Sequence, residues 1–332
     1  MKKLFALILA LVMVLTLVAC GAAEKTPGTA DGNEPGAPAG NDGYTVGIIQ
    51  LAPHVALDAA TKGFQDALTE AFGDKVTFDV VNAAGDSNTC VTAANSFVTK
   101  GYDLILGNAT AALQAAYNAT ETIPVLGTAI TEYGTALGLT DFDGTVGGNV
   151  SGTSDLPPLD QQAQMIKDWY PDAKTVGLLY CSNENNSQYQ VDAVQGFLEE
   201  LGYTCTQYPF SDSNDMAAVT QTAADNSDIL YVPTDNTCAS STGIIDNICR
   251  PAKIPVFCGE EGICQGCGVA TLSISYYDLG VATGKMAVKI LKGESNISEM
   301  PIEYAANFTL KYNPTICEEL GVTPPEGYEP IE

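Results

Sequence analysis

The chain has 332 residues, and its 14 Lys and Arg against 40 Asp and Glu give a formal net charge of −26. At about 150 residues per domain, this length suggests two domains with ample room for buried cores. Nucleic acids and anionic lipids are bound through clustered Lys and Arg, so the acidic excess argues against both as partners. The single histidine, His54, excludes any catalytic or metal site that needs two.

The N-terminal segment has the pattern of a signal peptide. Lys2 and Lys3 precede residues 4–19, which carry no charge. This run is too short to favour a membrane-spanning helix of about 20 residues. It ends in Leu-Val-Ala-Cys-Gly at 17–21, which resembles the lipobox of bacterial lipoproteins, where the cysteine is lipidated. We expect residues 1–19 to be a lipoprotein signal peptide and Cys20 to be the lipidation site; the alternative is an ordinary secretory signal followed by a chance cysteine.

Residues 20–43 are expected to form a disordered tether. Residues 21–43 contain six Gly, three Pro and five Ala, and no large apolar side chain. Such a segment cannot bury enough apolar surface to offset the chain entropy lost on folding. As a flexible chain it spans about 26 Å root-mean-square. The sequence therefore predicts a folded domain held by lipid at the extracytoplasmic face of the cell membrane.

Nine cysteines follow Cys20, and an odd number leaves at least one outside any disulfide. A zinc cluster is a second possibility, and its ligands would be Cys249, Cys258, Cys264 and Cys267. Only Cys264 and Cys267 have the close spacing typical of a zinc or redox site. Other cysteines sit in apolar runs, such as Leu-Leu-Tyr-Cys at 178–181, where cysteine packs as a small hydrophobic residue. We favour free structural thiols over disulfides and over a metal site.

The sequence of the expected folded part repeats itself. Thr-Val-Gly-Ile-Ile-Gln at 45–50 recurs as Thr-Val-Gly-Leu-Leu-Tyr at 175–180, and Asp-Leu-Ile-Leu at 103–106 recurs as Asp-Ile-Leu-Tyr at 228–231. Two further matches are Gly-Phe at 63–64 and 196–197 and Ile-Pro-Val at 123–125 and 254–256. Matches in the same order with similar offsets predict two equivalent lobes.

Each lobe has the pattern of alternating strands and helices. Short apolar runs, typical of parallel strands buried on both faces, occur at 45–51, 76–82, 103–107, 123–127, 175–181, 203–209, 228–232 and 254–258. Amphipathic stretches at 57–72, 88–100 and 216–225 predict helices between them. This alternation predicts an α/β fold of two doubly wound parallel-sheet lobes.

The chain order predicts a hinge of three crossings between the lobes. A Gly-rich segment at 146–154 suits the first crossing, and residues 271–275 and 302–310 are expected to be the others. Lobe one would comprise residues 44–152 and 276–301, and lobe two residues 153–270 and 311–325. Such a hinge is suited to closing on a small ligand.

Ligands of open parallel sheets bind beyond the carboxyl ends of the strands. Lobe one presents mostly neutral hydrogen-bonding groups there, whereas lobe two adds carboxylates. This division suits a zwitterion, whose carboxylate is held by hydroxyls and helix amides and whose ammonium is held by Asp. The candidate ligand-binding residues are Gln50, His54, Asn108, Thr110, Thr128, Asn186, Ser187, Thr234, Asp235, Glu260 and Tyr276.

Five ordered segments carry a family resemblance, and they lie at 47–58, 149–155, 185–187, 231–236 and 276–280. Together they resemble the ABC-transporter substrate-binding lipoproteins often described as tryptophan- or tyrosine-transport proteins, over about residues 44–322. The resemblance implies the type I periplasmic-binding-protein fold, an aromatic or other apolar L-amino acid in the cleft, and an ABC permease as partner. By motif it implies that Thr110, Ser187 and Asp235 present polar groups to the ligand.

Several of these residues also have simpler interpretations. His54 lies four residues before Asp58 and would pair with it at the start of a helix. Asp235 and Thr110 have the sequence context of helix-capping residues. Tyr276 would stack on an aromatic ligand or pack in the core.

No hydrolase, phosphate-binding or zinc-protease motif occurs in the sequence. We therefore expect a monomeric binding protein that is not an enzyme, with no catalytic residue, cofactor or metal. Two alternatives remain open. One is the same fold binding a sugar or nucleoside, and the other is a zinc or thiol redox surface lipoprotein that uses Cys264 and Cys267.

The lipidation hypothesis predicts the behaviour of Cys20→Ser. This variant should fold but be released from the membrane fraction, because the lipid has to attach to the missing sulfur. Several acyl chains hold a lipoprotein firmly, whereas one binds only marginally. Fractionation followed by immunoblotting measures the change, and retention at the wild-type level would contradict the anchor.

Overall fold

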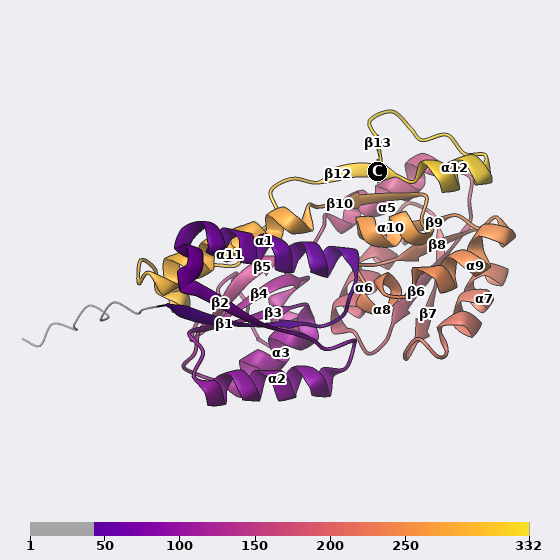
Figure 1. Ribbon diagram of the computed structural model, residues 1–332. Helices are drawn as coiled ribbons and strands as arrows, with labels where there is room; N and C mark the ends of the chain where they lie inside the picture. The colour runs from indigo at the N-terminus through magenta and orange to yellow at the C-terminus, as the bar shows by residue number, and fades with distance from the viewer. Residues whose placement is uncertain (1–42, 332) are drawn as a thin grey trace, which may run out of the picture. The chain divides into compact units, whose positions relative to one another are not determined.

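The computed structural model describes residues 43–331, whose strands gather into two sheets (Figure 1). The expected signal peptide, Cys20 and the tether up to residue 42 lie outside the described residues. The strand order is β11-β5-β4-β3-β1-β2 in the first sheet and β13-β12-β10-β9-β8-β6-β7 in the second. Because 5-4-3-1-2 matches 10-9-8-6-7 strand for strand, the two equivalent α/β lobes are confirmed.

The strands agree closely with the apolar runs of the sequence. The first sheet contains β1 (Tyr44–Gln50), β2 (Val76–Asn82), β3 (Leu104–Asn108), β4 (Val125–Ile130), β5 (Val150–Ser154) and β11 (Glu303–Tyr304). The second contains β6 (Thr175–Cys181), β7 (Thr204–Phe210), β8 (Ile229–Val232), β9 (Val256–Cys258), β10 (Ala270–Ser273), β12 (Thr309–Tyr312) and β13 (Glu329–Pro330). The paired strands run parallel except β10 and β12, which are antiparallel.

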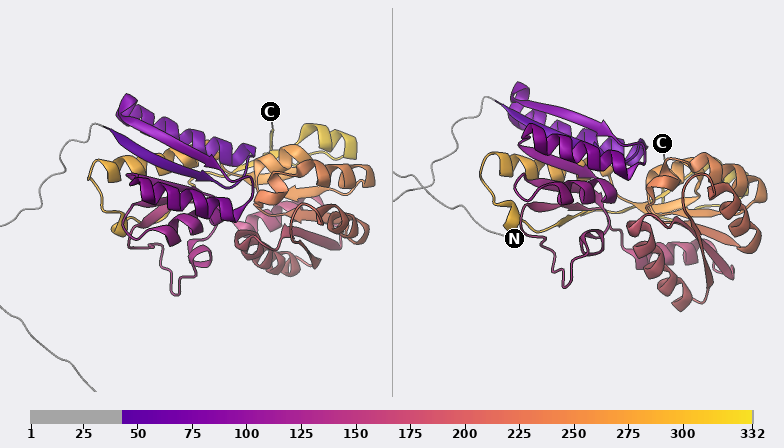
Figure 2. Two further views of the ribbon diagram at one scale, coloured as in Figure 1. Left: turned by 60° about the horizontal axis from the view of Figure 1, so that its bottom comes forward. Right: turned by 90° about the horizontal axis from the view of Figure 1, so that it is seen from below.

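Helices cover both faces of each sheet (Figures 1 and 2). They are α1 (Val55–Phe72), α2 (Ser87–Lys100), α3 (Thr110–Ala119), α4 (Tyr133–Leu137), α5 (Leu159–Trp169), α6 (Asn185–Glu200), α7 (Met216–Asn226), α8 (Asn236–Ala239), α9 (Thr242–Ala252), α10 (Glu261–Cys267), α11 (Tyr276–Leu291) and α12 (Pro314–Leu320), with short 3₁₀ turns η1 (Gly73–Lys75) and η2 (Ile297–Glu299). Side chains alternate along β1, so Val46 and Ile48 pack with Phe64 of α1, whereas Ile49 packs with Phe97 of α2.

The repeated residues make the same contact in both lobes. The backbone N–H of Thr45 donates to Oδ2 of Asp103 at 2.7 Å, and the N–H of Thr175 donates to Oδ2 of Asp228 at 2.9 Å. Each Asp N–H in turn donates to the carbonyl of its Thr. The pair ties the start of the third strand of each lobe to the start of the first, which is why Thr and Asp recur at these positions.

The chain passes between the lobes after β5, after β10 and between β11 and β12. The structure differs from the expected crossing at 271–275, because residues 271–273 belong to β10 and pair with β12 in the second sheet. The expected crossing at 302–310 likewise contains β11, which pairs with β5 in the first sheet, and the start of β12. The apolar sequence of a sheet strand and that of a crossing strand look alike, so the sequence located the crossings only approximately.

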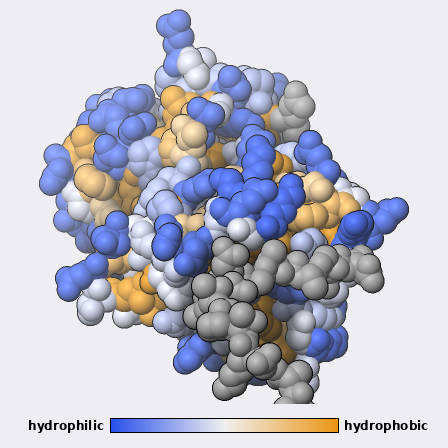
Figure 3. Space-filling view, turned by 90° about the vertical axis from the view of Figure 1, so that its left-hand side faces the viewer, coloured by the Kyte–Doolittle hydropathy of each residue, from blue (hydrophilic) through white to orange (hydrophobic). Residues whose placement is uncertain are grey.

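On the face shown in Figure 3, hydrophilic side chains surround smaller hydrophobic areas. Among the described residues, no helix combines the length and the apolar character needed to cross a membrane.

Helices α1 and α11 approach each other through glycines. A Cβ on Gly280 would lie 2.0 Å from the carbonyl oxygen of Ala60, and one on Gly63 would lie 2.1 Å from the carbonyl oxygen of Tyr277. The two backbones are therefore in direct contact, and no side chain can be inserted without moving a helix. This contact packs α11 against α1 of the first lobe, although α11 follows β10 of the second lobe in the chain.

Gly280→Ala should therefore destabilise the protein by about 1–3 kcal/mol, the usual cost of overpacking a tight contact. Gly196→Ala on α6 is the matched control, because nothing lies within 4 Å of its added Cβ. The control should be neutral or stabilising by up to about 1 kcal/mol, since Ala is the better helix former. Denaturant unfolding measures both changes, and equal effects of the two substitutions would contradict the packing argument.

Candidate functional site

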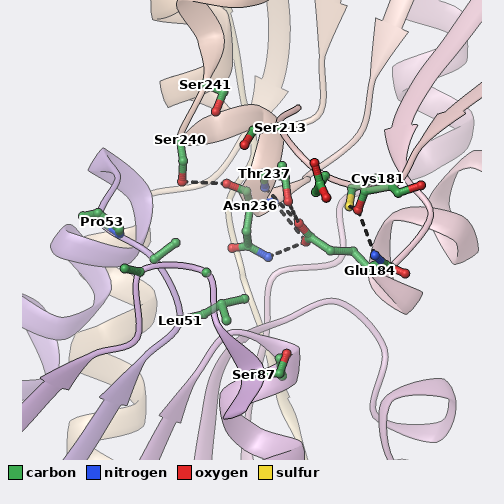
Figure 4. A pocket seen from close by; sticks show the side chains of 17 residues that line it. Leu51, Pro53, Ser87, Cys181, Glu184, Ser213, Asn236, Thr237, Ser240 and Ser241 are labelled. Carbon is green, nitrogen blue, oxygen red and sulfur yellow. Dashed lines mark hydrogen bonds between the residues drawn. The ribbon is translucent and has the colours of Figure 1, made fainter. Parts of the chain in front are cut away.

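A cavity of about 720 Å³ lies where the carboxyl ends of strands from the two lobes face each other (Figure 4). We call it the outer cavity, and its volume is in the range typical of small-molecule sites, roughly 300–1,000 Å³. The first lobe lines it mainly with apolar groups, among them Leu51, Pro53 and Ala111. The second lobe contributes polar groups, among them Glu184 and Asn236. The lining therefore suits a ligand with one apolar and one polar side.

A second, much smaller space of about 10 Å³, the inner cavity, adjoins the first and has room for about one water molecule. Asn236 lines both cavities. The inner cavity is lined by His54, Ala56, Leu57, Ala129, Thr131, Asp155, Asn186, Thr234, Asp235, Asn236, Ala239, Glu260 and Tyr276. Three of these described lining residues are acids and none is Lys or Arg.

The lobes touch between the two cavities. Nε2 of His54, just before α1, lies 3.2 Å from Oδ1 of Asn236, the first residue of α8. Asn236 Nδ2 donates to Glu184, so its Oδ1 is free to accept from His54. Burial lowers the pKa of His54, although the bond to Asn236 opposes this. The imidazole is therefore neutral at pH 7, and its Nε2–H donates across the cleft.

Glu184 holds Asn236, the second-lobe partner of His54, in place. Its carboxylate accepts from the backbone N–H groups of Asn236 and Thr237, at 3.0 and 2.8 Å, and from both of their side chains. Four donors on one carboxylate hold the start of α8 rigidly in place (Figure 4).

Asp235 and Glu260 are buried acids that cap short helices. Asp235 accepts from the N–H groups of Cys181 and Cys238 at 2.7 and 2.8 Å, one on each oxygen. Glu260 accepts from the N–H groups of Gly262 and Ile263 at 2.6 and 2.5 Å, again one on each oxygen. Burial raises the pKa of Asp235, as does Glu184 nearby, and burial raises the pKa of Glu260 to about 7.

Asp155 is the third buried acid, and it directly follows β5. Its Oδ2 accepts from the hydroxyl of Tyr276 at 2.9 Å. Burial raises its pKa to about 6, a rise that the Tyr276 and Thr131 hydroxyls oppose. Its Oδ1 is buried without a hydrogen-bond partner, as are Nδ1 of His54 and Oγ1 of Thr234. Buried polar atoms without partners are rare, so three around one cavity indicate that a ligand or water belongs there.

Six of the eleven candidate residues line the inner cavity, and they are His54, Asn186, Thr234, Asp235, Glu260 and Tyr276. The remaining five, Gln50, Asn108, Thr110, Thr128 and Ser187, line neither cavity. The candidate list leaves out Asp155, Thr131, Glu184 and Asn236, although Glu184 and Asn236 are among the polar residues that follow apolar runs of the second lobe. The sequence could have indicated Asp155, because it is a carboxylate at the end of the segment 149–155, which carries part of the family resemblance.

Three of the residues that line neither cavity hold the scaffold together. Gln50 Oε1 accepts from Thr61, and Asn108 Nδ2 donates to the carbonyl of Leu57, so both hold the first turns of α1. Thr128 belongs to a hydroxyl cluster that joins β4, β5 and α11, and its partners are Thr153 and Thr283.

The cysteines after Cys20 are all free, and all but the half-buried Cys205 are buried. Burial raises the pKa of Cys181 to about 11 and that of Cys249 to about 12. Cys264 and Cys267 pack in the apolar core of the second lobe. Within residues 43–331 no group of three or more His, Cys, Asp or Glu is placed to hold a metal ion. These buried thiols therefore pack as small hydrophobic groups.

A family model described as ABC transporter substrate binding protein matches residues 45–328. The chain belongs to this family. It is 35% identical over 305 residues to a tyrosine-binding protein of Clostridioides difficile, a match that covers 91% of this chain and 87% of the relative.

Two solved structures are similar to this substrate-binding protein in sequence and in fold. One, from Streptococcus pneumonia in complex with L-Trp, is 34% identical, covers 87% of this chain and all of the relative, and superposes with a TM-score of 0.82. The other is a ligand-free, open substrate-binding protein with adhesive properties from Clostridium difficile, which is 36% identical, covers 87% of this chain and 99% of the relative, and has a TM-score of 0.67.

The buried acids predict how the stability of the unliganded protein depends on pH. The pKa values of Asp155 and Glu260, about 6 and 7, lie above their ordinary values of 3.8 and 4.5. Between about pH 4 and 7 the folded protein therefore binds protons that the unfolded chain has released, so the free energy of unfolding falls as pH rises.

We expect the protein to be more stable at pH 5 than at pH 8 by at least about 1 kcal/mol, because one pKa unit corresponds to about 1.4 kcal/mol. Thermal and denaturant unfolding at the two pH values measure this difference. In the double variant Asp155→Asn, Glu260→Gln the difference should shrink. A wild-type protein that is more stable at pH 8 would contradict the argument.

Proposed function

We propose that this chain is the extracytoplasmic substrate-binding component of an ABC importer, and that its lobes close on an aromatic or other apolar L-amino acid. The observation that carries the proposal is the inner cavity, which is lined by three acids and surrounded by buried polar atoms without partners. Such a space suits a cationic group, and an α-ammonium is small enough to occupy the place of a water molecule. The tyrosine-binding and L-Trp-bound relatives support the same ligand class.

The remaining parts of an amino acid also have matching surroundings. The side chain of His54 makes no capping bond to α1, so the first N–H groups of this helix are available to a carboxylate, and Ala56 and Leu57 of the first turn line the inner cavity. The adjoining outer cavity, with its apolar first-lobe wall, offers room for a large side chain once the lobes part. His54 would then have to release Asn236, because their contact divides the two cavities.

The proposed cellular setting is supported by the family and by the N-terminal sequence pattern. We propose that lipid on Cys20 and the flexible tether keep the monomeric domain beside an ABC permease, to which it delivers its ligand. The protein would bind and release that ligand unchanged, without catalysis. A sugar or nucleoside ligand is less well supported, because neither explains three buried acids without a counter-ion.

A thermal-shift screen tests the ligand class. The purified protein is heated with amino acids, sugars and nucleosides, and a ligand at 100 times its Kd adds about 2.7 kcal/mol of stability. L-Tyrosine, L-tryptophan or another apolar L-amino acid should raise the melting temperature, whereas its D-enantiomer serves as the matched control. A shift with sugars or nucleosides alone would overturn the proposal.

A further inference from the structure

The three acids of the inner cavity are not equivalent in their hydrogen bonding. Asp235 and Glu260 each have both oxygens occupied by backbone N–H groups. Asp155 is only 3% exposed, lines the same cavity, and has one oxygen, Oδ1, without a hydrogen-bond partner. The Thr131 hydroxyl is near enough to affect its pKa but makes no hydrogen bond to it that meets normal geometry. Of the three, Asp155 alone has a carboxylate oxygen that accepts no hydrogen bond, and this oxygen is the first choice for a new donor.

We propose that Asp155 binds the ammonium group of the amino-acid ligand, while Asp235 and Glu260 act as helix caps that add negative potential. This inference rests on the proposed function and names the residue that recognises the amino group. It differs from the sequence-based expectation that Asp235 holds the ammonium. An ammonium at Oδ1 would complete the hydrogen bonding of Asp155 and supply the missing counter-charge.

Tyr276 is the positioning residue for this carboxylate. Its hydroxyl donates to Oδ2 at 2.9 Å, so Oδ1 is the oxygen left for the ligand. Asp155 lies on the crossing after β5, and Tyr276 begins α11 after the crossing that follows β10. Their bond therefore joins two of the three hinge segments at the point where the ligand charge would be neutralised.

The surroundings predict a pH dependence of binding. The titratable groups that act on Asp155 are Tyr276 of α11, Tyr133 of α4 and Glu260 at the start of α10. The pKa of Asp155 is about 6 without ligand, so its carboxylate is protonated progressively below that pH. Affinity for an amino acid should then fall below pH 6. Affinity for the same molecule without its amino group should not fall in this way.

The central experiment compares two ligands on two proteins by calorimetric titration. The ligands are L-tyrosine and 3-(4-hydroxyphenyl)propanoate, which lacks only the amino group; L-tryptophan and 3-(indol-3-yl)propanoate replace them if tyrosine does not bind. Asp155→Asn should weaken amino-acid binding about 30- to 4,000-fold, as for a buried charge that loses its partner. Binding of the desamino acid should change less than about 3-fold, because the variant retains shape and the acceptor for Tyr276.

Tyr276→Phe tests the positioning role. Removing the hydroxyl raises the pKa of Asp155, because that bond favours the carboxylate. The pH below which amino-acid affinity falls should therefore move upward, which a loss of packing alone would not cause. An unchanged midpoint would overturn the positioning role of Tyr276.

The outcomes separate this inference from the proposed function. If the wild type binds no amino acid, the proposed function fails. If it binds one, but Asp155→Asn weakens both ligands equally or neither, the ammonium is held elsewhere and the inference fails. Should Asp155→Asn not fold, the wild-type pH titration decides: loss of amino-acid affinity below pH 6 without loss for the desamino acid supports Asp155, and parallel curves overturn it.

Discussion

The site depends on the burial of negative charge without a counter-ion. The carboxyl groups of Asp155, Asp235 and Glu260 lie around one small cavity, and its described lining contains no Lys or Arg. Removing a carboxylate from water is costly, which is why burial raises the pKa of each group. Backbone N–H groups at the starts of α8 and α10 offset part of this cost for two of them. A cationic group enclosed between the lobes can relieve the remaining free-energy cost of burying these carboxylates.

The duplicated fold brings these groups together from distant parts of the chain. Asp235 and Glu260 follow neighbouring strands of the second lobe, β8 and β9, whereas Asp155 lies on the crossing after β5. The glycine contact between α1 and α11 holds the start of each helix at the cavity, with His54 before one and Tyr276 at the beginning of the other. The α1–α11 pair therefore positions His54 and Tyr276 together at the inner cavity.

The hydrogen bonding also shows why polarity at a strand end is an incomplete guide to ligand contact. Gln50 and Asn108 end β1 and β3, yet their amide groups bond to the first turns of α1. A helix that begins beside a sheet edge leaves backbone groups that need partners, and the nearest polar side chains supply them. Such residues support the site without lining either cavity. From sequence position alone, they are predicted to contact the ligand just as His54 is.

The sequence by itself determined the two lobes, their strands and the edge at which a ligand would bind. Apolar runs, helical periodicity and a repeat of Thr45 and Asp103 in the second half are local or one-dimensional signals, and all survive in the structure. Tertiary structure decided which oxygen atoms remain free and where the crossings begin. Hydrogen-bond partners such as Tyr276 for Asp155, 121 residues away, exist only once the chain is folded. The choice of ammonium-binding acid depends on those partners, because an acid already satisfied by backbone N–H groups and one with a free oxygen have the same sequence letter.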